Sequence, residues 1–559
     1  MSRLPASARA LGEVFRNPDL GRLQLAWVGV SFATWTFVIT LGVYAFDAAG
    51  AAAVGVAGLV RLLPGALASP FSGLLGDRYS RRAVLVWSAT TMAGVLGGAS
   101  LAVTAGAPTW LVFALAGLFT VAASPYIPAE GALMPQLART PQELSAANVT
   151  HSVMDNLGFL GGSISAGVLL AVSSVQAVFT LAALAAVASC IAILLTRPDS
   201  RPRYVDEVAA RGLARQATAG LRAMIADPAL RLLGTSLTLL VFVEGAADVL
   251  IVIIALDLLE LGNSSVGYMN AAWGVGALLA GAGLAVLINR GRLVEGLVVG
   301  SLLTGAMLAL PGVSPVVVVV YAAWFGVGFG YTLVEVADNT LLQRLGDDEV
   351  LGRVRGSLET VRLAAMALGA IAVTVLVELL GIRAAVLVVA SILPCFALLR
   401  WGRLRSFEVG APVEERHFSL LRADPIFTPL PLATLERLTH DLIELSADTN
   451  QDVITQGDVG DRFYLIEAGR VEVFENKVHR RFQAAGESFG EIALLRGEPR
   501  TATVRTTEPT RLLALDAGHF INAVAGHGRS SQAADGVIEH RLPRPPSSTR
   551  DRSEAHAET

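Results

Sequence analysis

The sequence predicts an α-helical membrane protein with twelve transmembrane helices in two six-helix halves, plus a small C-terminal β-barrel (jelly roll) domain with flanking helices. Three observations predict this fold class. Long blocks of Ala, Leu, Val and Gly fill roughly the first 400 residues. Arginines recur between alternate blocks. The remaining residues have the composition of a soluble domain, with short apolar runs separated by glycines.

The overall composition excludes an ordinary soluble protein. Hydrophobic residues make up 53% of the chain and charged residues 16%, whereas a typical soluble domain has about 25% charged residues. The mean hydropathy is +0.57. The net charge of −4 is too small to indicate nucleic acid as a partner. The N-terminal segment is polar and carries four arginines, unlike the apolar core of a secretory signal.

The apolar blocks predict the number of membrane spans. A helix needs about 20 apolar residues to cross a bilayer. Blocks of this length predict spans at 24–46, 52–75, 83–105, 109–134, 146–171, 175–196, 232–256, 266–289, 294–312, 315–341, 356–379 and 382–400. The fourth, fifth and tenth are the least certain in pattern, because they contain acidic residues.

The positions of the arginines predict the orientation. Residues 1–405 contain 26 arginines and no lysine, and the N-terminus and even-numbered loops hold 23 of them. Arg61 and Arg362 fall within spans, and Arg383 alone lies on the other side. Cytoplasmic loops of membrane proteins are enriched in basic residues. We therefore expect both termini in the cytoplasm and the spans in the cell's inner or plasma membrane.

The predicted spans divide into six plus six around a long basic segment, as in carriers built from two parallel halves. The expected parts are a cytoplasmic N-terminal segment (1–23), an N-terminal half (24–196), a cytoplasmic linker (197–231), a C-terminal half (232–400), a second linker (401–417), a soluble domain (418–542) and a disordered tail (543–559).

A charged loop follows the second span. It reads Gly73-Leu-Leu-Gly-Asp77-Arg78-Tyr-Ser-Arg81-Arg82. The loop resembles the signature loop of the major facilitator superfamily, with Ser in place of the second glycine. Membership implies a transporter in which this loop governs the change between conformations and does not bind substrate. On the simpler interpretation, the three arginines only anchor the cytoplasmic side. That interpretation leaves Asp77 and the two glycines unexplained.

A second stretch suggests a branch of that family. Residues Pro128-Ala-Glu-Gly-Ala-Leu-Met-Pro135, continuing to Asn148, resemble siderophore and macrolide exporters. The resemblance implies efflux of a small amphipathic compound. It does not identify the substrate, the direction or the coupling ion.

Ionisable residues inside the spans are costly unless paired or hydrated, and they often mark function. They are Arg61, Glu130, Asp155, Glu244, Asp248, Glu335, Asp338 and Arg362. Glu244 and Asp248 are four residues apart and share a helix face, and Glu335 and Asp338 do so at a spacing of three. We expect these faces to point to a central cavity, where a carboxylate couples transport to protons. The alternative is structural pairing, for example with Arg61 or Arg362.

The C-terminal domain contains one cluster of residues typical of phosphate binding. It runs Gly486-Glu-Ser-Phe-Gly490-Glu491-Ile492-Ala493, and Arg500-Thr501 follow. Gly490 permits close approach of a ligand, and backbone N–H groups near Ile492 and Ala493 can meet an anionic oxygen. An arginine binds phosphate through its planar guanidinium.

This cluster resembles the phosphate-binding cassette of the cyclic-nucleotide-binding family, in which an acid and an arginine are nine residues apart, as Glu491 and Arg500 are. The resemblance implies that Arg500 binds the cyclic phosphate and that Glu491 accepts a hydrogen bond from the ribose. Thr501 stands where many cAMP-binding members have Ala, so the resemblance does not decide between cAMP and cGMP as the ligand. A domain that has lost its ligand is the alternative. A lid helix is expected within 529–542.

Together these features predict a secondary transporter, of the exporter kind, regulated by cytoplasmic cAMP or cGMP. The alternatives are a lipid flippase regulated in the same way and a membrane-tethered receptor without transport. We expect no enzyme and no metal, because the sequence has no nucleophile–base set or metal-ligand cluster. The expected partners are the lipid bilayer, a small-molecule substrate and the cyclic nucleotide. The sequence leaves open the oligomeric state and whether the nucleotide activates or inhibits.

Overall fold

The computed structural model describes residues 12, 14–197, 222, 224–289, 293–345, 348–405, 415–430 and 432–525, and a few positions between 530 and 537. The chain forms two compact units, Met1–Glu408 (unit 1) and Val409–Thr559 (unit 2). The expected lid helix and the tail at 543–559 lie almost wholly outside the described residues, as does most of the linker at 197–231.

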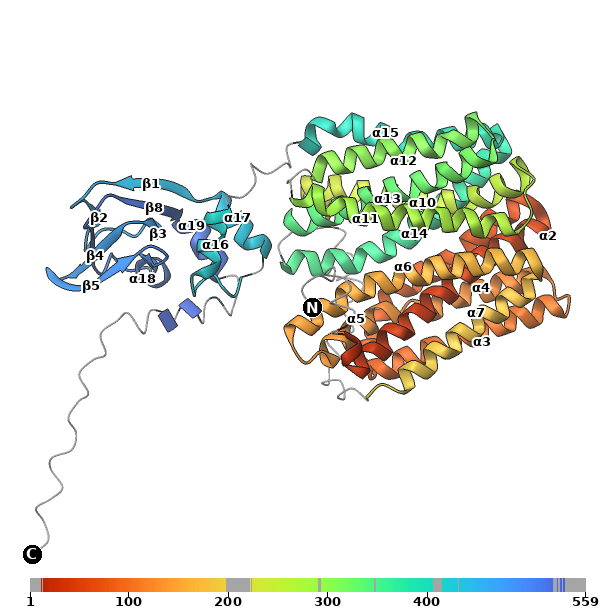
Figure 1. Ribbon diagram of the computed structural model, residues 1–559, viewed down its shortest axis with the longest axis horizontal. Helices are drawn as coiled ribbons and strands as arrows, with labels where there is room; N and C mark the ends of the chain where they lie inside the picture. The colour runs from red at the N-terminus through yellow and green to blue at the C-terminus, as the bar shows by residue number, and fades with distance from the viewer. Residues whose placement is uncertain are drawn as a thin grey trace, which may run out of the picture. The chain divides into compact units, whose positions relative to one another are not determined.

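Unit 1 is a helical bundle (Figure 1). In chain order its helices are α2 (Pro18–Arg78), α3 (Arg81–Thr104), α4 (Thr109–Ala123), α5 (Tyr126–Leu137), α6 (Pro141–Val172), α7 (Val175–Leu194), α10 (Pro228–Ile253), α11 (Ser264–Asn289), α12 (Leu293–Val313), α13 (Val317–Leu345), α14 (Asp348–Leu380) and α15 (Ile382–Arg405). A π-helical turn, Ile254–Leu258, follows α10 directly. Helices α2 to α7 lie together, and α10 to α15 form a second group beside them (Figure 1).

Ten of the described helices are long and apolar enough to cross a membrane. This number differs from the twelve predicted spans for two reasons. The first two predicted spans both lie in α2, whose backbone leaves helical geometry only at Ala49 and Gly50. The eighth predicted span coincides with α11, whose side chains beyond Gly281 lie outside the described residues, so only part of its apolar length counts toward a span.

Small residues bring the two groups of helices together. Helix α2 packs against α14, and α6 packs against α11. At the second contact, a Cβ atom on Gly267 would stand 2.4 Å from the backbone nitrogen of Gly167. No side chain fits on Gly267 at this separation, so α11 needs glycine here, whereas a Cβ atom on Gly167 would stand 3.0 Å from the Tyr268 ring. Close packing of small residues is a typical way to join helices in membranes, where burial alone favours no helix contact over lipid.

Unit 2 contains two four-stranded antiparallel sheets. The first has the order β1-β8-β3-β6 and the second β2-β7-β4-β5. The strands are β1 (Ile443–Ala447), β2 (Asp452–Ile454), β3 (Arg462–Ala468), β4 (Arg470–Glu475), β5 (Val478–Ala484), β6 (Ser488–Phe489), β7 (Thr503–Thr506) and β8 (Thr510–Asp516). Register along β3 and β8 pairs Phe463 with Leu515 and Leu465 with Leu513, so their apolar side chains share the buried face.

Helices cover one end of these sheets. They are α16 (Glu415–Ala423), α17 (Leu432–His440), the short α18 (Glu491–Arg496) and α19 (Ala517–Ala525). Phe427, Phe463 and Phe520 are fully buried between helices and strands, with the rings of Phe463 and Phe520 stacked at 4.8 Å. Large aromatic side chains supply much of the apolar area that stabilises a small domain. Unit 2 therefore has a core of its own, separate from that of unit 1.

Candidate functional site

The six residues predicted to bind a nucleotide line one pocket in unit 2. They are Gly490, Glu491, Ile492, Ala493, Arg500 and Thr501. The pocket lies between β5, α18 and the start of β7, and apolar side chains such as Ile454 and Val504 complete its wall. A pocket with an apolar wall and a few polar groups at one end suits a ligand that has a flat ring and an anionic group.

Arg500 is held rigidly at this pocket. Its guanidinium donates to the backbone oxygens of Gly490 (2.9 Å) and Arg462 (2.7 Å). It also pairs with the Asp461 carboxylate at 3.1 Å. The side chain of Arg500 is 4% exposed, whereas that of Asp461 is 69% exposed. A buried guanidinium held by neutral carbonyls and by one solvated carboxylate keeps positive charge available for an anionic ligand.

Two backbone features place the arginine. The Arg500 N–H donates to the Asp458 oxygen at 2.8 Å, and the Arg500 oxygen accepts from the Gly457 N–H at 2.9 Å. Gly490 has φ +92°, a conformation that glycine adopts without strain. A Cβ atom there would stand 2.7 Å from Nη1 of Arg500. Glycine at this position therefore satisfies the turn and leaves room for the guanidinium.

Sequence reasoning missed several residues in this pocket or beside Arg500. Tyr464 places its ring 5.9 Å from the Arg500 guanidinium, and burial raises the pKa of its hydroxyl, so Tyr464 stays neutral. Gln483 and Arg481 line the pocket from β5. The Gln483 amide donates to the Ser488 oxygen at 2.8 Å, which leaves its carbonyl oxygen buried without a partner among the described residues. Polar residues alternating along a strand were the available signal.

Unit 1 pairs several of the charges predicted inside the membrane. Arg61 on α2 contacts the Asp248 carboxylate on α10 at 3.4 Å. Their side chains are 12% and 23% exposed. This geometry agrees with structural pairing, the alternative to a role in proton coupling. A cation and an anion from different helices neutralise each other inside the bundle. Each offsets part of the desolvation cost of the other.

The other predicted carboxylates have separate surroundings. Glu244 on α10 accepts a hydrogen bond of 2.6 Å from the Tyr331 hydroxyl on α13. Asp338 is fully buried and accepts one of 2.6 Å from Ser236. Asp155 on α6 accepts one of 2.9 Å from Ser31. Asp338 was expected to face a central cavity with Glu335, but it instead packs between α13 and α10. Of the two residues, Glu335 lines a cavity.

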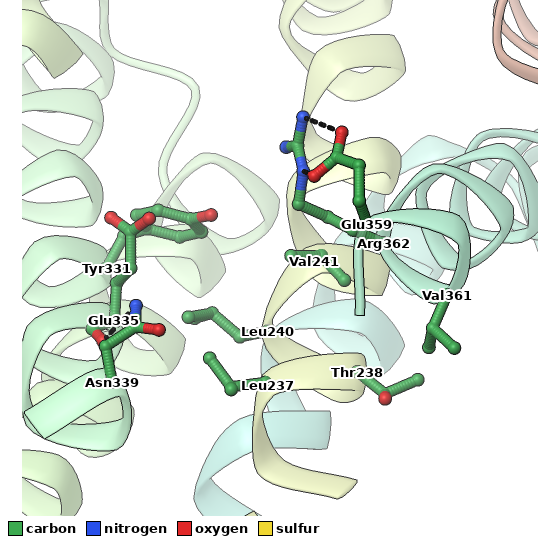
Figure 2. Close-up of a pocket in the computed structure, with 10 residues that line it drawn as sticks. All are labelled: Leu237, Thr238, Leu240, Val241, Tyr331, Glu335, Asn339, Glu359, Val361 and Arg362. Carbon is green, nitrogen blue, oxygen red and sulfur yellow. Dashed lines mark hydrogen bonds and ion pairs between the residues drawn. The ribbon is translucent and has the colours of Figure 1, made fainter. Parts of the chain in front are cut away.

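Glu335 lines a cavity of about 220 Å³ between α10, α13 and α14. Figure 2 shows Glu335 and Tyr331 on one side of this cavity and Arg362 with Glu359 on another, with α10 side chains such as Leu240 between them. Arg362 donates to Glu359 at 3.1 Å. Tyr331, Asn339 and Glu359 were not predicted, because nothing in the local sequence distinguishes them from other helix residues.

A histidine also escaped prediction. His151 on α6 lies 3.2 Å from the buried Glu130 carboxylate on α5 and stacks on the Trp27 ring at 4.6 Å. Glu130 had been noted as an ionisable residue inside a span, but without a partner. A titratable pair thus joins α5 and α6 in the first group of helices.

The predicted gating loop is only partly described. The backbone is helical through Arg78, but the side chains of Gly73, Asp77 and Arg78 lie outside the described residues. Ser80 caps α3, its hydroxyl accepting from the Ala83 N–H at 3.2 Å. Arg82 donates to the Ile193 and Leu194 oxygens at the end of α7. Cationic groups stabilise a helix C-terminus. Arg81 begins α3 and is half-buried.

Comparison with known proteins agrees with the two-unit division. Unit 1 is a bundle of long apolar helices, so the chain is a multi-pass membrane protein. The model of the Major Facilitator Superfamily matches residues 23–370, more than half of the chain. The chain therefore belongs to the major facilitator superfamily. The model of the cyclic nucleotide-binding domain matches residues 444–527, so unit 2 carries a domain of that kind.

Two of the relatives match short stretches of this chain. A cAMP-dependent protein kinase regulatory subunit of Yarrowia lipolytica is 40% identical over 91 residues, 16% of this chain and 24% of that protein. An uncharacterized protein of Mycobacterium tuberculosis is 37% identical over 118 residues, 20% of this chain and 23% of that protein. This chain thus spans about a quarter of each relative.

Solved structures with similarity include the regulatory domain of Toxoplasma gondii PKA with cAMP, at 19% identity and a TM-score of 0.22. That match covers 24% of this chain and 56% of the other. The sensor domain of the regulator DNR from Pseudomonas aeruginosa matches at 20% identity and a TM-score of 0.21. It covers 22% of this chain and 93% of the other.

Proposed function

We propose that this chain is a secondary active transporter that exports a small amphipathic compound and is regulated by cAMP or cGMP bound to unit 2. The observation that carries the regulatory part is Arg500. It is buried at the pocket, held by backbone carbonyls and matched by a solvated carboxylate, so a cyclic phosphate can take the place of Asp461. The transport part rests on membership of the major facilitator superfamily.

The proposed arrangement in the membrane keeps the sequence prediction of twelve spans. The break at Ala49 and Gly50 supports two spans within α2, and the length of α11 supports one more. The arginine distribution supports cytoplasmic termini in the cell's inner or plasma membrane. The two antiparallel sheets of unit 2 support a jelly roll. The domain limits predicted at 401–417 and 418–542 stay part of this proposal.

The proposed regulation is a linkage between two sites on one chain. A nucleotide shifts the carrier only if it binds more tightly to unit 2 in one carrier conformation than in the other. The loop at Gly73 to Arg82 is proposed to govern the alternation of the two helix groups. Of the four carboxylates predicted to exchange protons, Glu244, Asp248, Glu335 and Asp338, we propose Glu335 for this role. It lines a cavity, whereas Asp248 pairs with Arg61 and Asp338 is fully buried against Ser236. No chemical reaction and no metal are part of this function.

A receptor without transport is the second candidate. The pairing of Arg61 with Asp248 favours it, because both charges are already neutralised within the bundle. A chain whose membrane charges are all structural could anchor unit 2 and do nothing else. Transport measured in proteoliposomes distinguishes the two candidates.

The first experiment is calorimetric titration of the full-length protein with cAMP and with cGMP. We expect binding of at least one, and its loss in Arg500→Ala, since a buried charge contact contributes about 2–5 kcal/mol. Arg505→Ala is the matched control, because Arg505 lies on β7 outside the pocket and pairs with Asp452. Failure of both nucleotides to bind would overturn the regulatory proposal.

Tryptophan fluorescence can measure whether nucleotide binding to unit 2 changes unit 1. All seven tryptophans lie in unit 1, the last being Trp401. A nucleotide-dependent change in tryptophan fluorescence that Arg500→Ala abolishes therefore reports a change in the carrier. Binding without any change in fluorescence or transport would leave unit 2 as a sensor that does not act on unit 1, contrary to the proposal.

A further inference from the structure

The cavity beside Glu335 has an uneven distribution of charge. Its walls are mainly apolar, with Leu237, Leu240 and Val241 from α10 and Val361 from α14. Arg362, the one cationic side chain among its described lining residues, donates to Glu359 at 3.1 Å and 3.5 Å. In Figure 2 this pair lies away from Glu335, which projects from α13. The cation of the cavity thus already has its own counter-ion.

Glu335 has no such counter-ion. The Asn339 amide donates to the Glu335 backbone oxygen at 2.9 Å, but the Glu335 carboxylate has no hydrogen bond or ion pair among the described residues. The charged groups near enough to act on it are the carboxylates of Glu244 and Asp155 and the Arg362 guanidinium. Glu244 is engaged by Tyr331 and Asp155 by Ser31, both through neutral hydroxyls. These hydroxyls bring no positive charge, so the one cation in the described lining of the cavity is the Arg362 guanidinium, which Glu359 already occupies.

We propose that this cavity binds an organic cation with an apolar body, and that Glu335 is its counter-ion. The inference rests on the proposed transport function, because it names the class of compound carried. An anionic compound would meet uncompensated carboxylates, and a neutral compound would leave Glu335 unpaired in a half-buried site. A cation neutralises Glu335, while its apolar part displaces water from the leucine and valine side chains.

The volume limits the size of the cation. About 220 Å³ is below the ~300–1,000 Å³ of common small-molecule sites. A single ring with a quaternary ammonium group is the expected scale. The Tyr331 ring at the cavity wall adds a surface that attracts cations.

The test measures binding of radiolabelled phenyltrimethylammonium to the purified full-length protein, with benzenesulfonate as an anion of similar size. We expect the cation to bind and the anion not to bind. Glu335→Gln keeps the shape and removes the charge, and should weaken cation binding about tenfold or more. Glu335→Asp should restore much of the affinity. Glu378→Gln is the matched control, because Glu378 lies on α14 outside the lining of the cavity.

The charge inference is overturned if Glu335→Gln binds the cation as the unaltered protein does, if benzenesulfonate binds equally well, or if the cation does not bind at all. Transport is scored separately in proteoliposomes with cationic, neutral and anionic compounds. Cation binding without transport of any compound would overturn the transporter and leave the charge inference standing. Transport of neutral or anionic compounds alone would overturn the charge inference and leave the transporter standing.

Discussion

Two buried arginines, Arg61 in unit 1 and Arg500 in unit 2, are held in opposite ways. Arg61 is 12% exposed and its carboxylate partner, Asp248, is 23% exposed. Arg500 is 4% exposed, but its carboxylate partner, Asp461, is 69% exposed, and its remaining acceptors are backbone oxygens. The first arginine has its counter-ion enclosed with it. The second has only neutral acceptors in the interior.

The difference separates a structural arginine from a binding one. An enclosed ion pair is already neutral, and any ligand must first break it at a high desolvation cost. An arginine held by carbonyls keeps its net charge, and a solvated carboxylate is easily replaced by a phosphate. Burial of the arginine alone does not distinguish the two cases. The exposure of its counter-ion does.

The largest expected effect comes from breaking the enclosed pair. Arg61→Leu leaves Asp248 without its partner, and removal of one member of a buried pair destabilises a protein by about 3–5 kcal/mol. The double substitution Arg61→Leu with Asp248→Leu should recover most of that loss. Thermal unfolding followed by tryptophan fluorescence measures unit 1 by itself, because every tryptophan lies there.

Arg383→Leu is the control for that experiment. Arg383 is an exposed arginine on α15, so its loss should change stability by no more than about 0.5 kcal/mol. A double variant as unstable as Arg61→Leu alone would contradict the interpretation of Arg61 and Asp248 as a mutually neutralising pair.

The next effect tests how tightly Arg500 is placed. Gly490→Ala puts a side chain at φ +92° and a Cβ atom 2.7 Å from Nη1 of Arg500. The backbone strain should cost about 1–3 kcal/mol, and displacement of Arg500 should also abolish nucleotide binding. Hydrogen exchange of unit 2 peptides measures the stability, and calorimetry measures the binding.

Gly497→Ala separates strain from contact. Gly497 has φ +64°, and a Cβ atom there would have no neighbour within 4 Å. This variant should lose similar stability and still bind nucleotide. Equal loss of binding in both variants would show that strain in α18, and not the contact with Arg500, accounts for the effect of Gly490→Ala.

The sequence allowed most of unit 2's site to be predicted and little of unit 1's. The nucleotide residues from Gly490 to Thr501 occupy one short stretch, so spacing along the chain reports their arrangement, and all six line one pocket. The membrane carboxylates were found because charge is rare in apolar helices. Their partners are far away along the chain. Arg61, 187 residues from Asp248, was one of the two arginines offered as a structural partner, and Tyr331, 87 residues from Glu244, was not named.

Helix periodicity misled in one place for a similar reason. A spacing of three puts Glu335 and Asp338 on one side of α13. The neighbouring helix α10 supplies Ser236 to Asp338 and leaves a cavity beside Glu335. Which residue of the pair meets open space depends on the facing helix. Periodicity along a single helix carries no information on that point.

The smallest expected effect is at an ion pair on the surface of unit 2, where both side chains are more exposed than Arg61 and Arg500. Asp452 and Arg505 form two hydrogen bonds, at 2.6 Å and 3.0 Å, and each side chain is 37% exposed. The Arg505 hydrogen bond holds the pKa of Asp452 below its usual value. Asp452→Asn should therefore cost at most about 1 kcal/mol, since solvent screens the pair.

The stability difference between the unaltered protein and Asp452→Asn should depend on pH, and the direction of that dependence follows from the lowered pKa of Asp452. The folded state holds Asp452 with a pKa below the ~3.9 of an unfolded chain, so the pair's stabilisation is fully present above that value and is lost as the pH falls through the folded pKa. Hydrogen exchange of β7 peptides in the unaltered protein and in Asp452→Asn should differ at neutral pH and converge in acid. A difference that persists unchanged in acid would show that the asparagine acts through packing, because a protonated aspartic acid has no charge for Arg505 to hold.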